Sequence, residues 1–179
     1  MRKLTSVKSI KNPYSKRILS NVLNKDPLKV YERSPRELQR LAAGLNSKQL
    51  QTPINKGKWS IGQIVSHLCD AEITISYRLR MSIAQSGGPI QAYDQDKWAD
   101  ALYREKSSCS EHVKLFSVLR NANVSLLKGL SSKEWQRYGM HEERGKETVE
   151  RMVQMTAGHD VNHLRQIKEI RDKFLGRSR

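Results

Sequence analysis

Four long stretches with apolar residues at helical spacing, each introduced by capping residues, constrain this 179-residue chain more than any other feature. Asp26 followed by Pro27 is a typical helix start, because the aspartate caps the first turn and the proline has no N–H to lose. Ser60 and Thr148 are N-cap residues of the same kind, and Gly176 is a typical stop signal. The periodicity predicts long helices over about 27–44, 61–85, 97–129 and 149–174.

The connections and two points inside these stretches are less regular. The pair Ser107-Ser108 interrupts the third stretch, so we expect a break in that helix. Pro35 falls inside the first stretch and predicts a bend or a restart there. The run from Tyr138 to Thr148 has no period of either kind, and we expect a loop there and no strand in the chain.

Four long helices with short or medium connections favour an all-α fold, and the economical architecture is a four-helix bundle. We assign residues 27–179 to this domain. Residues 1–26 differ from it in being basic and interrupted by Pro13, and we expect an extension that lies on the surface of the bundle. No apolar run is long enough for a membrane span or for the core of a secretory signal.

The formal net charge is +15, and residues 1–25 contribute seven basic residues and no acidic one. Such a charge favours loose, non-specific contact with polyanions, including nucleic acid. The chain has no helix-turn-helix, RNP-like or zinc-finger motif that would read a nucleic acid. Cys69 and Cys109 have no CxxC spacing, which favours a reducing, cytoplasmic location over a disulfide framework.

Three of the five histidines have the spacing of a metal site. His159 and His163 lie at i and i+4 of a predicted helix, on one face, where two imidazoles can hold one ion. His67 lies on the apolar face of the second helix and completes the site if the second and fourth helices are neighbours. Three imidazoles suit Zn²⁺ or Ni²⁺ and leave a position open for water or substrate. Taken singly, such histidines are more often exposed or hydrogen-bonded core residues.

Several polar residues extend this hypothesis. Asp70 and Asp160 could accept the second ring N–H of a ligand histidine, and the alternative is a simple surface charge on each helix. Gln166 faces the same way as the histidine pair and could line a pocket. The chain has no HExxH motif, so the sequence does not support a metalloprotease.

Two runs of sequence carry a family resemblance. KWSIGQIVSHLCDAE (58–72) and GMHEERGKETVERMVQMTAGHDVNHLRQI (139–167) resemble the DinB/YfiT-like superfamily, and YDQDKW (93–98) fits the same pattern. The resemblance covers the chain from about residue 27 to residue 174. It implies a four-helix bundle and leaves the basic N-terminal extension outside the family pattern.

The resemblance also implies a divalent metal held by His67, which follows the W-S motif, and by His159 and His163 of the HDxxH motif. Family members are similar to metal-dependent hydrolases, or to transferases and isomerases that use bacillithiol, mycothiol or glutathione, and many pair as dimers. His141 matches the loop histidine of an H-x-E-x-G pattern. This match places His141 at the rim of the pocket; the alternative is that its ring forms a hydrogen bond that pins the loop.

Two functions follow as hypotheses. The first is a metal-dependent hydrolase or a thiol-dependent transferase, in which a homodimer acts on a small molecule with Zn²⁺ or Ni²⁺ and, for the transferase, a low-molecular-weight thiol. The alternative is a basic helical binding module for nucleic acid or an acidic partner, in which the metal is structural or absent. The first hypothesis makes His67, His159 and His163 the metal ligands.

Overall fold

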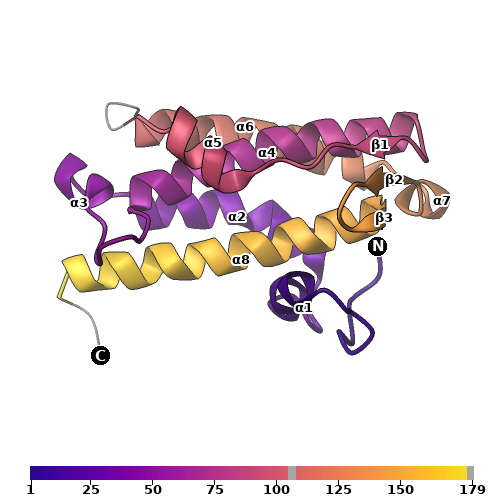
Figure 1. The fold of residues 1–179 in the computed structure, drawn as a ribbon, viewed down its shortest axis with the longest axis horizontal. Helices are drawn as coiled ribbons and strands as arrows, with labels where there is room; N and C mark the ends of the chain where they lie inside the picture. Colours follow the sequence, from indigo (N-terminus) through magenta and orange to yellow (C-terminus); the bar gives the residue numbers. More distant parts are fainter. Residues whose placement is uncertain (105–107, 177–179) are drawn as a thin grey trace.

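The fold is known from a computed structural model, which describes residues 1–104 and 108–176. Long helices lie side by side, and a small sheet covers one end of them (Figure 1). The elements are, in chain order, α1 (Pro13–Ser20), α2 (Pro27–Ala42), α3 (Ser47–Gln51), α4 (Ile61–Ala84), β1 (Pro89–Ile90), α5 (Gln95–Leu102), α6 (Cys109–Lys128), α7 (Ser132–Trp135), β2 (Tyr138–His141), β3 (Gly145–Thr148) and α8 (Val149–Phe174).

Helices α2, α4, α6 and α8 form the bundle. Helix α8 packs against α2 and α4, and α6 packs against the same two helices. In the bundle, α2 and α4 therefore lie diagonally opposite each other across the core, and so do α6 and α8. The predicted four-helix bundle is confirmed, and so is the condition on which the third histidine depended, because α4 and α8 are neighbours.

The core consists of two apolar clusters with a polar layer between them. The cluster near the sheet includes Leu79, Leu127 and Val153, and the cluster at the other end includes Ile64 and Phe116. Each such side chain contributes about 1.5–3 kcal/mol when it is fully removed from water. The middle turns of the same helices carry buried polar residues instead, which are Glu72, Ser76, Arg120, Asn123 and Asp160.

The predicted helix starts are the observed ones. The carboxylate of Asp26 accepts from the N–H groups of the first turn of α2, and Thr148 caps α8 through its hydroxyl. Ser60 and Gln63 form a reciprocal capping box at the start of α4. These caps supply acceptors for N–H groups that have no partner within the helix.

Pro35 does not divide α2, which continues from Pro27 to Ala42. Because proline has no N–H, the carbonyl of Tyr31 loses its helical donor. The Nη1 atom of Arg120 on α6 donates to that carbonyl at 2.6 Å. A tertiary hydrogen bond thus replaces the helical one, which is why the predicted restart is absent.

The N-terminal segment is more than a surface extension. Asn12 caps α1, Pro13 occupies its first turn, and the helix packs against α8. Ile18, Leu19 and Val22 are buried, so this part of residues 1–26 belongs to the packed structure. The signal for α1 was present in the sequence, because Asn12-Pro13 is the same kind of helix start as Asp26-Pro27.

The expectation of no strand was wrong. β2 and β3 form an antiparallel hairpin, and β1 pairs in parallel with β2. Strands of four and two residues are too short to show an alternating pattern of apolar and polar residues. The one local signal of the hairpin was Gly145, whose φ of +70° at the turn favours a glycine.

The predicted third helix consists of α5 and α6. Ser108 caps α6 and so confirms a break, whereas Ser107 lies outside the described residues. Within the described part of the chain, no helix is both long and apolar enough to cross a membrane.

We predict that Gly158→Ala loosens the contact between α1 and α8. A Cβ atom at this position would lie 2.3 Å from the carbonyl oxygen of Ile18, and the backbone there can move only with the helix. Overpacking of this kind costs about 1–3 kcal/mol. Thermal or urea unfolding would measure the loss.

Gly129→Ala is the matched control. Its Cβ would lie 3.5 Å from the nearest atom, and the residue does not need positive φ. We expect a neutral effect or a gain of up to about 1 kcal/mol. Equal losses of stability in the two variants would contradict the packing argument.

Candidate metal centre

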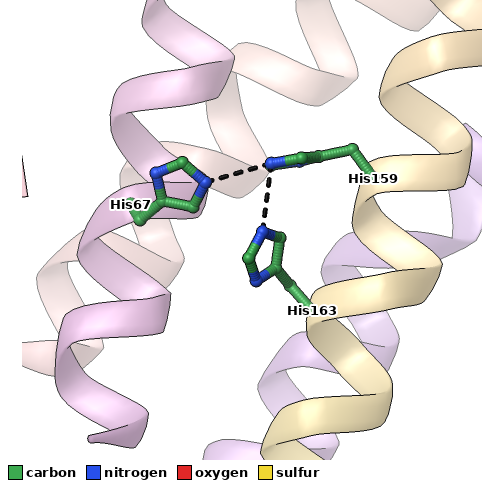
Figure 2. Close-up of side chains that lie close together, drawn as sticks. All are labelled: His67, His159 and His163. Atoms are coloured by element: carbon green, nitrogen blue, oxygen red, sulfur yellow. Dashed lines mark hydrogen bonds between the residues drawn. The ribbon is translucent and has the colours of Figure 1, made fainter. Parts of the chain in front are cut away.

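Three histidine side chains converge in the space between α4 and α8. His67 projects from the second turn of α4, and His159 and His163 project from successive turns of α8 (Figure 2). The Nε2 atom of His159 lies 3.0 Å from Nε2 of His67 and 3.1 Å from Nε2 of His163. Among the described residues, these three make the group whose ligand atoms lie within 4.8 Å of one another.

Hydrogen bonds alone do not account for this convergence. A neutral imidazole nitrogen carries either one proton or one lone pair. Nε2 of His159 can therefore make only one of its two short contacts as a hydrogen bond. A shared cation lets all three lone pairs act at once, and tetrahedral Zn–N bonds of about 2.0–2.1 Å put ligand nitrogens roughly 3.3–3.4 Å apart, close to the distances observed here. The donor set fits a divalent ion in both chemistry and spacing.

The three rings are held in their neutral form. Burial lowers the pKa of His67 to about 3, helped by the nearby His163. Burial also lowers the pKa of His163 to about 4, and that of His159 to well below its ordinary value. Since only a neutral imidazole offers a lone pair, burial prepares all three for a metal ion at neutral pH.

Gln166 and Trp59 hold the ligand rings in place. The Oε1 atom of Gln166 lies 2.8 Å from Nδ1 of His163, a contact that puts the ring proton on Nδ1 and leaves the Nε2 lone pair free. The ring of Trp59 stacks on His163 and lies 5.0 Å from the ring of His67. Gln166 was predicted to face this site, whereas Trp59 was considered only as part of the W-S motif before His67.

The two aspartates do not orient ligand histidines. Asp160 points to the other side of α8, where it accepts a hydrogen bond from Arg120 at 2.7 Å. Asp70 is half-buried on α4, where burial raises its pKa and the charge of His112 partly offsets that rise. In the described part of the chain, neither carboxylate is hydrogen-bonded to His67 or to the pair on α8. The suggestion that these carboxylates accept a ligand's second ring N–H was therefore wrong.

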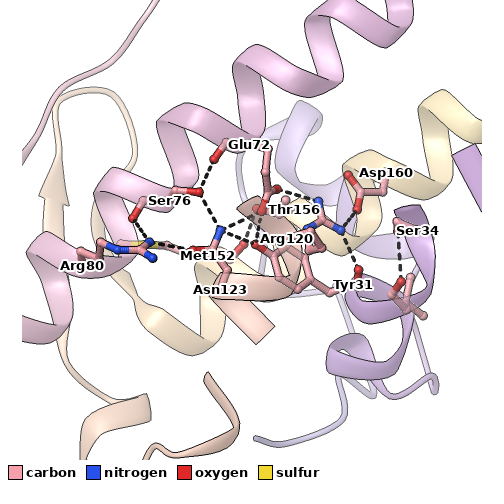
Figure 3. A network of polar contacts seen from close by, with 11 residues as sticks. Tyr31, Ser34, Glu72, Ser76, Arg80, Arg120, Asn123, Met152, Thr156 and Asp160 are labelled. Carbon is pink, nitrogen blue, oxygen red and sulfur yellow. Dashed lines mark hydrogen bonds and ion pairs between the residues drawn. The ribbon is translucent and has the colours of Figure 1, made fainter. Parts of the chain in front are cut away.

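Arg120 instead makes Asp160 part of a buried ionic layer behind the histidines. Its guanidinium donates to Asp160, to Glu72 and to the carbonyl of Tyr31 at 2.6–2.7 Å (Figure 3). Arg120 and Glu72 are 0% exposed. A guanidinium in such a place requires several acceptors to offset its desolvation.

The second oxygen of Glu72 extends this layer. It accepts from the hydroxyl of Tyr31 at 2.8 Å and from Nδ2 of Asn123 at 2.7 Å. The layer thereby links α2, α4, α6 and α8. Glu72 follows His67 on α4, and Asp160 is next to His159 on α8. The ionic layer therefore sets the relative positions of the two helices that carry the histidines. Helical periodicity does not predict this layer, although Asn123 within an otherwise apolar helical pattern was a signal.

Two cavities of about 580 and 570 Å³ lie beside the three histidines. His159, Tyr14 and Gln95 line both of them. A small molecule in either cavity can thus approach the face of the cluster that the protein leaves open. Tyr14 belongs to α1, so the N-terminal segment forms part of the wall of the site.

The remaining histidines have separate places. His141 is buried at the end of β2, lines the larger cavity and accepts a hydrogen bond from the N–H of Glu143 at 3.2 Å. His141 therefore lines the pocket and also forms a hydrogen bond within the loop, which are the two places considered for it. His112 lies on α6 and outside the cluster.

Fold and site define the class of this protein as an all-α bundle with a three-histidine cluster between two long helices. Residues 31–167 match the family model described as the DinB superfamily, and the chain belongs to that family. The resemblance seen in the sequence motifs is confirmed.

Relatives and a solved structure agree with this assignment. A protein of Oceanobacillus iheyensis, named "Putative metal-dependent hydrolase", is 28% identical over 85% of this chain and 88% of its own length. YfiT of Bacillus subtilis, with the same description, is 26% identical over 80% of this chain and 81% of its own length. The solved structure of YfiT, described as having "an unusual four-helix bundle topology", has a TM-score of 0.78 at 24% identity and covers 85% of this chain and 87% of YfiT.

We predict that Arg120→Met lowers the free energy of unfolding by about 3–5 kcal/mol, because it leaves two buried carboxylates without their partner. Chemical denaturation would measure this loss. Arg40→Met is the control, because Arg40 pairs with Glu37 at the surface, where such pairs contribute about 0–1 kcal/mol. Similar losses in the two variants would contradict a structural role for the buried layer.

Proposed function

We propose that this chain is a metal-dependent enzyme that acts on a small molecule, with hydrolysis as its reaction class. His67, His159 and His163 are the proposed ligands of a divalent ion, Zn²⁺ or Ni²⁺. The convergence of their three Nε2 atoms beside two cavities is the observation that carries the proposal. The names of the relatives in the DinB superfamily support the same reaction class.

When bound by these three histidines, a divalent ion would polarise a carbonyl group and would lower the pKa of bound water to about 7. The protein's own contribution is to keep the three imidazoles neutral by burial and to orient them. Gln166 and Trp59 fix two of the rings, and the Arg120 layer fixes the helices behind them. Such supporting contacts commonly change metal affinity or activity by about 10–100-fold.

A thiol-dependent transferase is the variant of this proposal that differs only in the group at the open position. A low-molecular-weight thiol would bind there in place of water. The second cavity supports this variant, since Arg17 and Lys58 on its wall could attract an anionic thiol. The free thiols of Cys69 and Cys109 agree with a reducing, cytoplasmic setting.

We expect the purified protein to hold about one divalent ion per chain, and His163→Ala to lose it, because two imidazoles seldom retain a metal that needs three. Elemental analysis after gel filtration would measure both. His112→Ala is the control, because it removes an imidazole outside the cluster and should keep the metal. Equal metal content in His163→Ala and the unchanged protein would contradict the ligand assignment.

Activity tests the enzyme proposal separately from the metal. The metal-loaded protein should hydrolyse 4-nitrophenyl acetate, or conjugate glutathione to 1-chloro-2,4-dinitrobenzene if it is a transferase. A chelator and His159→Ala should each remove at least about 90% of the rate, because catalysis by metal-bound groups requires the ion. Rates unaffected by both treatments would contradict the enzyme proposal and leave the metal measurement standing.

A further inference from the structure

Arg78 on α4 is a buried cation that forms no ion pair with any residue that the structure describes. It is 8% exposed, and none of the ion pairs among the described residues includes it. Its Nη2 atom donates to the carbonyl of Gln91, whereas its Nε atom has no hydrogen-bond partner. The ring of Tyr93 lies 5.7 Å from the guanidinium carbon. A buried guanidinium is costly unless an anion accompanies it.

The position of Arg78 connects it to the metal centre. It lines the larger cavity, which also reaches His159. Arg78 comes eleven residues after His67 on α4, which is about 16 Å along a helix. Ala71, Thr74 and Ile75 line the cavity along this stretch of α4, and Met152, Met155 and Thr156 of α8 line it as well.

His141 supplies a second donor in the same cavity. Its Nδ1 atom accepts the N–H of Glu143, so the neutral ring carries its proton on Nε2. Burial lowers the pKa of His141, and the charges of Arg144 and Arg78 lower it further. The ring is therefore a neutral N–H donor, and it lies close enough to Arg78 for the charge of Arg78 to lower its pKa.

The carboxylates that line this cavity are committed elsewhere or exposed. Glu147 forms two hydrogen bonds with Arg144, at 2.8 and 3.0 Å. Asp94 accepts two backbone N–H groups as the cap of α5, and Glu143 is exposed to solvent. None of them forms an ion pair with Arg78 among the described residues. Burial and the charge of Arg144 lower the pKa of Arg78, and the charges of Glu147 and Glu142 offset this only in part.

We propose that the larger cavity binds a small organic anion, with its carboxylate or phosphate group held by Arg78 and His141. The apolar and thioether surface between α4 and α8 accommodates the rest of the molecule, and the far end of the molecule reaches His159 of the three-histidine cluster. The identification of this anion as the substrate rests on the proposed function. The anion site itself does not depend on the metal.

Calorimetric titration with three probes of one shape tests this proposal. The probes are 4-phenylbutyrate, 4-phenylbutyl phosphate and the uncharged 4-phenylbutyramide, at one low salt concentration. We expect at least one anion to bind about tenfold or more tightly than the amide, since charge-assisted hydrogen bonds are about twice as strong as neutral ones. The anion that binds more tightly distinguishes a carboxylate ligand from a phosphate ligand.

Variants locate the binding. Arg78→Gln should weaken the anion about tenfold or more and leave the amide unchanged, and Arg78→Lys should have an intermediate effect because it keeps the charge but loses the planar fork. Arg40→Gln removes the same charge from an exposed site and should have no effect. Circular dichroism would verify that the variants fold. If Arg78→Gln does not fold, the anion affinity of Arg78→Lys tests the role of Arg78 instead.

Three outcomes would overturn the proposal. They are equal affinity for the anions and the amide, anion affinity unchanged by the substitutions at Arg78, and no binding of either anion. Titration of His163→Ala separates this site from the metal centre, because the anion should still bind without metal. A purified protein without metal would contradict the proposed function but would leave the anion site to be judged by these titrations.

Discussion

The burial of Arg120 between Glu72 and Asp160 is the interaction on which the rest of the bundle depends. A guanidinium with no exposure must find acceptors within the protein, and here they come from three other helices. This requirement sets the register of α2, α4 and α8 around α6 more strictly than apolar packing would. An apolar core tolerates small shifts, whereas an ionic layer loses several kcal/mol, on the order of 3–5, when a partner is displaced.

The histidine cluster benefits from this rigidity. His67 and His159 come from different helices, and their Nε2 atoms lie 3.0 Å apart. A shift of one helix along the other by one turn, about 5.4 Å, would separate them beyond the reach of one ion. The ionic layer and the histidine cluster lie on different faces of α8. One face of this helix carries Asp160, which pairs with Arg120, and another face carries His159 and His163.

The positions of the bundle helices could be predicted from the sequence, because caps and helical periodicity depend on residues that are neighbours along the chain. The caps at Asp26, Ser60 and Thr148 and the helical periodicity located the bundle helices. The failures have physical causes. The hairpin has strands of four residues, too short for a pattern. Pro35 was expected to bend or restart the helix; the helix does not restart, and a hydrogen bond from Arg120 on a distant helix reaches the carbonyl that Pro35 leaves without a donor. Residues 1–26 were expected to lie on the surface because basic residues dominate there, although Ile18, Leu19 and Val22 are buried apolar side chains.

The sequence by itself determined that His159 and His163 share a helix face, since the i, i+4 relation is a property of any α-helix. Only the tertiary structure decided that His67 joins them, because α4 and α8 meet through packing between residues far apart in the chain. It also decided that Asp160 faces Arg120 and that the Nε atom of Arg78 is buried with no hydrogen-bond partner among the described residues. A side chain's partners across a bundle depend on the relative rotation of whole helices, which local spacing does not contain.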